Sequence, residues 1–197
     1  MTDAVEPPET VEPPAGESAA PPLAAQRVAP QASDAPRGGT APRGLQDFFS
    51  LAWSSVLGAG YFPVASGTFG SLCALPLVYA FSALSVPLWL VTFAGYTAVT
   101  IWTAQRAGEL HGVVDSGRIV ADEVVGQLLA LAFVPLSVQT VLAGFLLFRL
   151  FDIVKPWPAS YFDKKVKNGF GVTMDDVVAG LFARAVVEAL LRFGVIS

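Results

Sequence analysis

The stretch Val86–Gln105, VPLWLVTFAGYTAVTIWTAQ, decides the fold class of this chain. A helix that crosses a bilayer needs about 20 mainly apolar residues, and this stretch supplies them without one charged side chain. It lies within 58 uncharged residues between Asp47 and Arg106. The sequence therefore predicts a membrane-spanning helix, with a core helix of a soluble all-α bundle as the alternative.

Three further apolar runs predict other helices. The run 71–84 contains Pro76 and is short for a span, so it indicates a short or re-entrant helix. The run 124–148 is interrupted by Pro135, and it fits one kinked span or two short helices that meet at the proline. Residues 177–196 predict an amphipathic helix. Because no strand alternation occurs, the expected fold class is all-α and membrane-associated.

The composition excludes several classes of protein. The chain is 53% hydrophobic and 14% charged, with a net charge of −4, which argues against a nucleic-acid binder held by a basic surface. Its single cysteine, Cys73, excludes an intramolecular disulfide and a cysteine-based zinc site.

Residues 1–44 differ in composition from the rest of the chain. They hold nine of the fifteen prolines, with alanine and six acidic residues. Such a segment buries too little apolar surface to offset the entropy of ordering, so we predict a disordered tail before a helical domain at 45–197. The alternative use of the tail is as a peptide ligand for a proline-binding module.

The charges of the domain are concentrated in two places. Residues 106–123 and 149–176 together carry 15 of the 19 charged side chains of residues 45–197. Because ionisable groups are costly in a membrane-type chain, such a concentration indicates a functional site.

The acidic residues allow two interpretations. Asp122-Glu123 and Asp175-Asp176 each directly precede an apolar run, where acids stabilise the N-terminus of a helix. Asp152 instead closes an apolar run, which capping does not explain. If the helix ends meet, these five carboxylates would repel one another unless they held a divalent cation, and all-oxygen ligands favour Mg²⁺ over Zn²⁺. Spacing alone leaves both interpretations open.

A segment rich in glycine and hydroxyl groups, PVASGTFGS at 63–71, offers a third polar element. Its glycines permit backbone conformations whose amides line an anion, although such segments often only turn the chain. The phosphate-binding candidates are Gly67, Thr68, Gly70 and Ser71, with Arg149 and Lys155 as cations. We expect Lys164, Lys165 and Lys167 to lie on a solvated cytoplasmic face.

Four blocks of sequence together resemble a known family. They are FRLFDIVKPWP at 148–158, GFGVTMDDVVAG at 169–180, DSGRIVADEVVG at 115–126 and the segment at 63–71. Taken in chain order, they resemble the phosphatidylglycerophosphatase A family over about residues 55–183. Ser66, Asn168 and Thr173 depart from the residues common in that family, and none of these departures removes a carboxylate or Lys155.

The resemblance implies a multihelical bundle and a Mg²⁺-dependent hydrolase. Its substrate would be the phospholipid phosphatidylglycerophosphate, and its product phosphatidylglycerol, on the cytoplasmic side of the bacterial inner membrane. The implied partners are this lipid and the membrane, and no nucleic acid.

On this basis we assign roles to particular residues. The predicted metal ligands are Asp122, Glu123, Asp152, Asp175 and Asp176. The predicted catalytic residues are Glu123, Asp152, Lys155 and Asp176, with attack by water or a covalent phosphate on Asp152 as alternatives. The rival function is a membrane carrier or binding protein for a divalent cation that uses the same acids. Carriers typically place their site near the bilayer midplane and often show internal repeats, whereas these acids lie at the ends of apolar runs.

Overall fold

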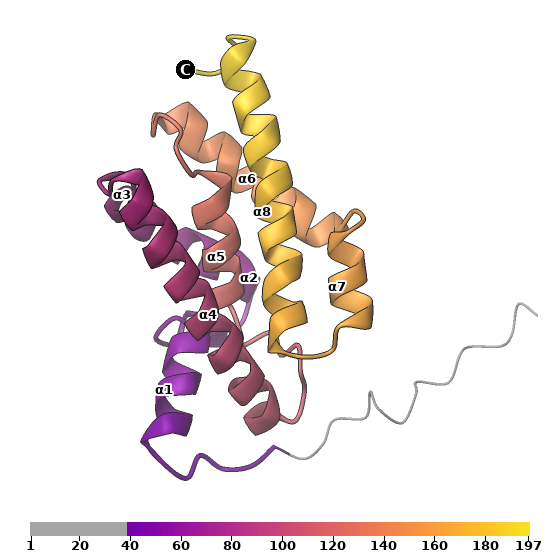
Figure 1. Ribbon diagram of the computed structural model, residues 1–197. Helices are drawn as coiled ribbons and strands as arrows, with labels where there is room; N and C mark the ends of the chain where they lie inside the picture. Colours follow the sequence, from indigo (N-terminus) through magenta and orange to yellow (C-terminus); the bar gives the residue numbers. More distant parts are fainter. Residues whose placement is uncertain (1–38) are drawn as a thin grey trace, which may run out of the picture. The chain divides into compact units, whose positions relative to one another are not determined.

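The computed structural model describes residues 39–197, and every regular element in this range is helical (Figure 1). The predicted all-α fold is therefore confirmed. The prediction for residues 1–44 falls outside the described residues except for 39–44, which precede the first helix. The elements in chain order are α1 (Leu45–Ser54), η2 (Ala59–Tyr61), α2 (Ser66–Cys73), α3 (Leu75–Ser82), α4 (Val86–His111), α5 (Ala121–Ala130), α6 (Val138–Val154), α7 (Ala159–Lys165) and α8 (Gly169–Arg192).

Helix α4 contains the apolar stretch that decides the fold class. It begins with Pro87 in its first turn, where the missing N–H costs nothing, and it ends before Gly112 in the left-handed conformation. The helix extends six residues past Gln105, as far as His111. Within residues 39–197 it is the one helix long and apolar enough to cross a membrane, and only 17% of its apolar window is buried.

The other apolar runs divide into separate helices. Helix α2 ends at Cys73, and α3 follows after Ala74 with Pro76 in its first turn. The run at 124–148 forms two helices, α5 and α6, with Pro135 in the segment between them. The two-helix alternative is therefore the correct one.

Helix α8 starts earlier than the sequence predicts. It begins at Gly169, where the Asn168 side chain accepts a hydrogen bond of 3.0 Å from the Gly171 N–H. Asp175 and Asp176 therefore lie in the second turn of the helix and do not cap its N-terminus. For these two acids the capping interpretation is wrong, because Asn168, seven residues before Asp175, supplies the cap.

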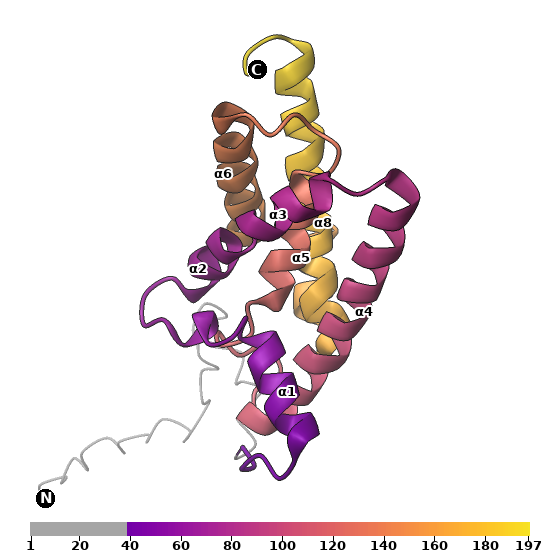
Figure 2. The same ribbon diagram turned by 90° about the vertical axis from the view of Figure 1, so that its left-hand side faces the viewer.

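Helix α5 lies at the centre of the described helices (Figure 2). On one side its Val124 and Leu128 pack with residues of α3 and with Trp89 of α4. On the other side its Ala130 packs with Phe148 of α6 and with Ala179 of α8. This central helix therefore packs against both α6 and α8.

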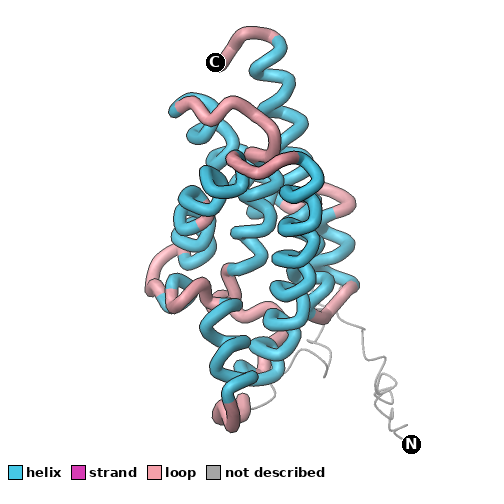
Figure 3. Tube along the Cα trace, turned by 60° about the vertical axis from the view of Figure 1, so that its left-hand side comes forward, coloured by secondary structure: helices cyan, strands magenta, loops and turns pink. Residues whose placement is uncertain are grey.

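Helices joined by loops make up the described residues (Figure 3), and α1 runs antiparallel to the C-terminal half of α4. Asp47 pairs with Arg106 at 2.7 Å, and Trp53 donates a hydrogen bond of 3.2 Å to Thr100. The ion pair neutralises the charge that ends the apolar part of α4.

Candidate active site

Three carboxylates from two helices converge in the interior. Asp122 and Glu123 stand in the first turn of α5, Asp176 stands in the second turn of α8, and one oxygen of each lies within 4.8 Å of the others. Asp122 also accepts the N–H of Glu123 at 3.1 Å, so one acid at this helix start has a capping role as well. The structure thus brings the pair Asp122-Glu123 together with Asp176 from a distant part of the chain.

Two glycines allow α5 and α8 to approach this closely. A Cβ on Gly180 would lie 2.4 Å from the carbonyl oxygen of Gly126, and a Cβ on Gly126 would lie 2.7 Å from that of Asp176. Only glycine fits such contacts, because the clashing atoms belong to backbone. Both glycines lie within the sequence blocks that resemble the family. The sequence does not show that they are the contact point of α5 and α8, because this depends on which helices pack together.

The three carboxylates repel one another. Burial, followed by the charge of Asp176, raises the pKa of Glu123 to about 8. Burial and neighbouring acids also raise the pKa of Asp122 and of Asp176 well above the usual range. Glu123 Oε2 is buried and has no hydrogen-bond partner within residues 39–197. A buried all-oxygen group with an unpaired acceptor fits a divalent cation such as Mg²⁺.

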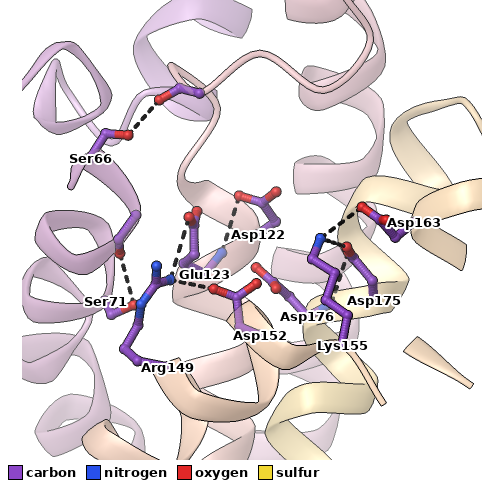
Figure 4. Close-up of polar contacts among 12 residues, drawn as sticks. Ser66, Ser71, Asp122, Glu123, Arg149, Asp152, Lys155, Asp163, Asp175 and Asp176 are labelled. Atoms are coloured by element: carbon purple, nitrogen blue, oxygen red, sulfur yellow. Dashed lines mark hydrogen bonds and ion pairs between the residues drawn. The ribbon is translucent and has the colours of Figure 1, made fainter. Parts of the chain in front are cut away.

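Asp152 and Arg149, both on α6, lie beside this three-carboxylate group (Figure 4). Arg149 Nη1 lies 2.6 Å from Asp152 Oδ2 and 3.6 Å from Glu123 Oε1. The Nε–H of Arg149 is buried without a hydrogen-bond partner in the described part of the chain. The guanidinium is therefore held by two acids and still has a donor available for an anion.

Lys155 lies on the opposite side of the acids (Figure 4). Its ammonium pairs with Asp175 of α8 and lies 2.9 Å from Asp163 Oδ1 of α7. Burial works to lower the pKa of Lys155, but the charges and hydrogen bonds of these acids more than offset it and raise the pKa. Burial raises the pKa of Asp175 to about 7 against the opposing effect of Lys155.

Asp175 is thus separated from the three-carboxylate group. It was predicted as a metal ligand, and in the structure its carboxylate faces Lys155. Asp163, which pairs with Lys155, was not predicted from the sequence as a site residue. It lies eight positions after Lys155 on another helix, so no helical spacing indicates the contact.

The predicted phosphate segment is helical from Ser66 onward. Ser66 begins α2 and donates a hydrogen bond of 2.7 Å to the carbonyl of Gly117, and the buried Ser71 hydroxyl donates to the carbonyl of Gly67. Ser71 therefore has its hydroxyl hydrogen engaged within the helix. Gly67 faces the site, because a Cβ there would lie 2.1 Å from Glu123 Oε1 and 3.0 Å from the Arg149 guanidinium.

The remaining two residues of the segment differ in position. Gly70 is buried against Val120, where a Cβ would lie 2.7 Å from the Val120 side chain. Thr68 is half-buried and follows Gly67 in the first turn of α2. The start of this helix, rather than the whole segment, therefore borders the acids.

Comparison with known proteins finds one family model and two relatives that share its name. The model of the phosphatidylglycerophosphatase A family matches residues 52–191. A phosphatidylglycerophosphatase A of Haemophilus influenzae is 44% identical over 68% of this chain and 83% of its own length. The Escherichia coli protein of that name is 35% identical over 66% of this chain and 76% of its own length.

A third relative carries a different name. A putative phosphatidylinositol-3-phosphatase of Bacteroides thetaiotaomicron is 39% identical over 69% of this chain and 89% of its own length. No solved structure matches the chain significantly. Because the family model spans most of the chain and the Haemophilus relative is 44% identical over most of its length, the chain belongs to the phosphatidylglycerophosphatase A family and is a phosphatase.

Proposed function

We propose that this protein is a Mg²⁺-dependent phosphomonoester hydrolase that converts phosphatidylglycerophosphate to phosphatidylglycerol and phosphate in phospholipid biosynthesis. The observation that supports this most strongly is the three-carboxylate group of Asp122, Glu123 and Asp176, with Arg149 and Lys155 on its two sides. Acids that hold a metal, next to cations that hold an anion, fit a phosphate ester.

The residues divide into two sets by chemistry. Asp122, Glu123 and Asp176 would hold Mg²⁺, with Asp152 next to them. When bound, the ion supplies positive charge that polarises a phosphoryl oxygen. Arg149 and Lys155 add donors for the other phosphoryl oxygens, and each is held in place by acids rather than by flexible contacts with solvent.

The start of α2 supports the same placement of the phosphate. The N–H groups of Ser66, Gly67 and Thr68 precede the first hydrogen-bonded turn, and the positive end of a helix dipole favours an anion. Since Gly67 lies over Glu123 and Arg149, a phosphate held there would also reach the acids. Gly70 and Ser71 support this helix start through packing and an internal hydrogen bond.

We assign to Asp152 the role of general base, which takes the proton of the attacking water. Its carboxylate lies beside Glu123 and Asp176 and is oriented by Arg149 at 2.6 Å. The alternative is that Asp152 attacks the phosphorus itself and carries the phosphate until water releases it. Rapid acid quenching with labelled lipid separates the two, because only the second leaves label covalently on the protein.

We place the protein in the inner membrane with its site facing the cytoplasm, and the distribution of charge along α4 supports this orientation. Its charged end carries Arg106 and Glu109, and the opposite end of the helix, near Val86, is uncharged. Basic residues favour the cytoplasmic side of a membrane protein, and Lys164, Lys165 and Lys167 lie near this end.

The deciding experiment measures phosphate release from detergent-dispersed phosphatidylglycerophosphate with and without Mg²⁺. Phosphatidylinositol 3-phosphate is the comparison substrate, because the Bacteroides relative bears that name. We expect Mg²⁺-dependent release, faster from phosphatidylglycerophosphate. Transport of a divalent cation into vesicles without phosphate release would instead support the carrier function.

A further inference from the structure

We propose that α7 and the segments next to it form a docking surface for the anionic headgroups of membrane phospholipids. The proposal rests on the proposed function, since it adds where the lipid surface meets the enzyme. We call this surface the basic α7 surface; its residues are Trp157, Tyr161, Lys164, Lys165, Lys167 and Phe170.

The lysines of the basic α7 surface are charged side chains without an ion-pair partner among residues 39–197. All three are exposed, and none has a carboxylate within ion-pair distance in residues 39–197. By contrast, Arg149 and Lys155 are each held by two acids. The dipole of α7 accounts for lysines in its last turn, but Lys167 lies beyond the helix end at Lys165. In a chain with a net charge of −4, this cluster is complementary to an anionic surface.

Large aromatic side chains flank the lysines. Trp157, Tyr161 and Phe170 are 78%, 53% and 45% exposed. Phe162 makes edge-to-face contacts with Tyr161 and with Phe170, so these rings are held together on α7 and the start of α8. Exposed aromatic rings beside lysines are typical of the headgroup region of a bilayer, where apolar and polar groups meet.

The surface lies at the charged end of the candidate spanning helix. Lys167 precedes Gly169 by two residues, and the Gly169 N–H donates a hydrogen bond of 2.9 Å to Gln105 Oε1 of α4. Gln105 is the last residue before Arg106, where the uncharged part of α4 ends. If α4 crosses the membrane, the lysines therefore stand at the level of the phospholipid headgroups.

The basic α7 surface is also connected to the site. Asp163 lies on α7 between Tyr161 and Lys164, and it pairs with Lys155 at 2.9 Å. An anionic lipid bound at the lysines is therefore next to the proposed phosphate position, because the ion pair between Asp163 and Lys155 joins α7 to the site. The surface would concentrate anionic lipid beside the acids and would not take part in bond cleavage.

The test replaces the three lysines and measures the rate at a lipid surface. Full-length protein in mixed detergent–phosphatidylcholine micelles receives a fixed fraction of phosphatidylglycerophosphate. The triple variant K164Q/K165Q/K167Q removes the charges, and K164R/K165R/K167R is the matched control that keeps them. Each lysine near an anionic membrane contributes roughly fivefold to lipid affinity. We therefore expect the glutamine variant to raise the apparent KM at least tenfold with kcat unchanged, and the arginine variant to match the wild type.

A water-soluble, short-chain analogue of the same lipid separates surface binding from catalysis. The glutamine variant should hydrolyse this analogue as fast as the wild type, and its rate on micelles should lose the wild-type sensitivity to salt. A wild-type KM on micelles would overturn the proposal, and so would an equal loss on both substrates. If the wild type releases no phosphate from either substrate, the proposed function fails, which is a different result.

Discussion

Gly67 of α2 lies directly against Glu123 of α5, so closely that a Cβ on residue 67 would stand 2.1 Å from Glu123 Oε1. The same Cβ would stand 3.0 Å from the guanidinium of Arg149. The start of α2 thus limits the positions that Glu123, a predicted metal ligand, and Arg149, a predicted phosphate-binding residue, can take.

Replacement of Gly67 by alanine should lower activity while the protein stays folded. The atoms that clash are the ends of two flexible side chains, so they can move at little cost in stability, but movement displaces Glu123 and Arg149. We expect kcat/KM to fall at least about tenfold, since small displacements in a site are costly. The free energy of unfolding should change by less than about 1 kcal/mol.

The matched control is Gly95→Ala on α4, where nothing lies within 4 Å of the added Cβ. Its activity should be unchanged, and its stability should rise by up to about 1 kcal/mol because alanine favours helix over glycine. Equal activity of the two variants would show that the contact of Gly67 with Glu123 is unimportant.

Asp176→Asn should abolish turnover without unfolding the protein. It removes one of three converging carboxylates, and we expect kcat to fall by at least about a hundredfold. Isothermal titration calorimetry should show weaker Mg²⁺ binding. The exposed Asp115, which lies outside the three-carboxylate group, supplies the control Asp115→Asn. Near-normal turnover of the Asp176 variant would refute the metal assignment.

Lys155→Met should destabilise the protein, because it leaves the buried Asp175 without its cation. Breaking a buried pair costs roughly 3–5 kcal/mol, and the partial exposure of Lys155 reduces our expectation to about 2 kcal/mol. The double variant K155M/D175N removes both charges and should recover most of the lost stability in chemical denaturation.

Activity should behave differently in the same pair of variants. If Lys155 contacts the phosphoryl group, phosphate release stays low in the double variant although its stability returns. Recovery of activity together with stability would mean that Lys155 has only a structural role.

The metal-free protein should become less stable as the pH rises from about 5 to about 8. The pKa of Asp175 is raised to about 7 and that of Glu123 to about 8, so the folded state holds protons that the unfolded state has already released. Stability falls with pH wherever the folded state binds more protons. Thermal unfolding in EDTA at several pH values measures this trend.

Addition of Mg²⁺ should reverse the trend, because a cation binds the ionised carboxylates and its stabilising effect grows as they lose protons. The Tm difference between Mg²⁺ and EDTA should therefore be small at pH 5 and largest near pH 8. A difference that is independent of pH would argue against these carboxylates as the metal ligands.

The amino-acid sequence by itself determined the helical elements and the residue types of the site. The uncharged stretch at 86–105 predicts a long helix, and Pro135 divides the apolar run at 124–148 into two helices. Both signals depend only on neighbouring residues, so the sequence alone is enough to find them. The acids, Arg149 and Lys155 were found because charge is scarce in this chain, so that a few charged side chains stand out.

Only the tertiary structure decided which of these residues meet. Asp175 and Asp176 are neighbours in sequence, but successive helical residues point about 100° apart, so one faces Lys155 and the other faces Asp122 and Glu123. Which direction each faces depends on where α8 lies against α5, and the backbone contact between Gly126 and Gly180 sets that position. Contacts of this kind join residues far apart in the chain, so no spacing in the sequence encodes them.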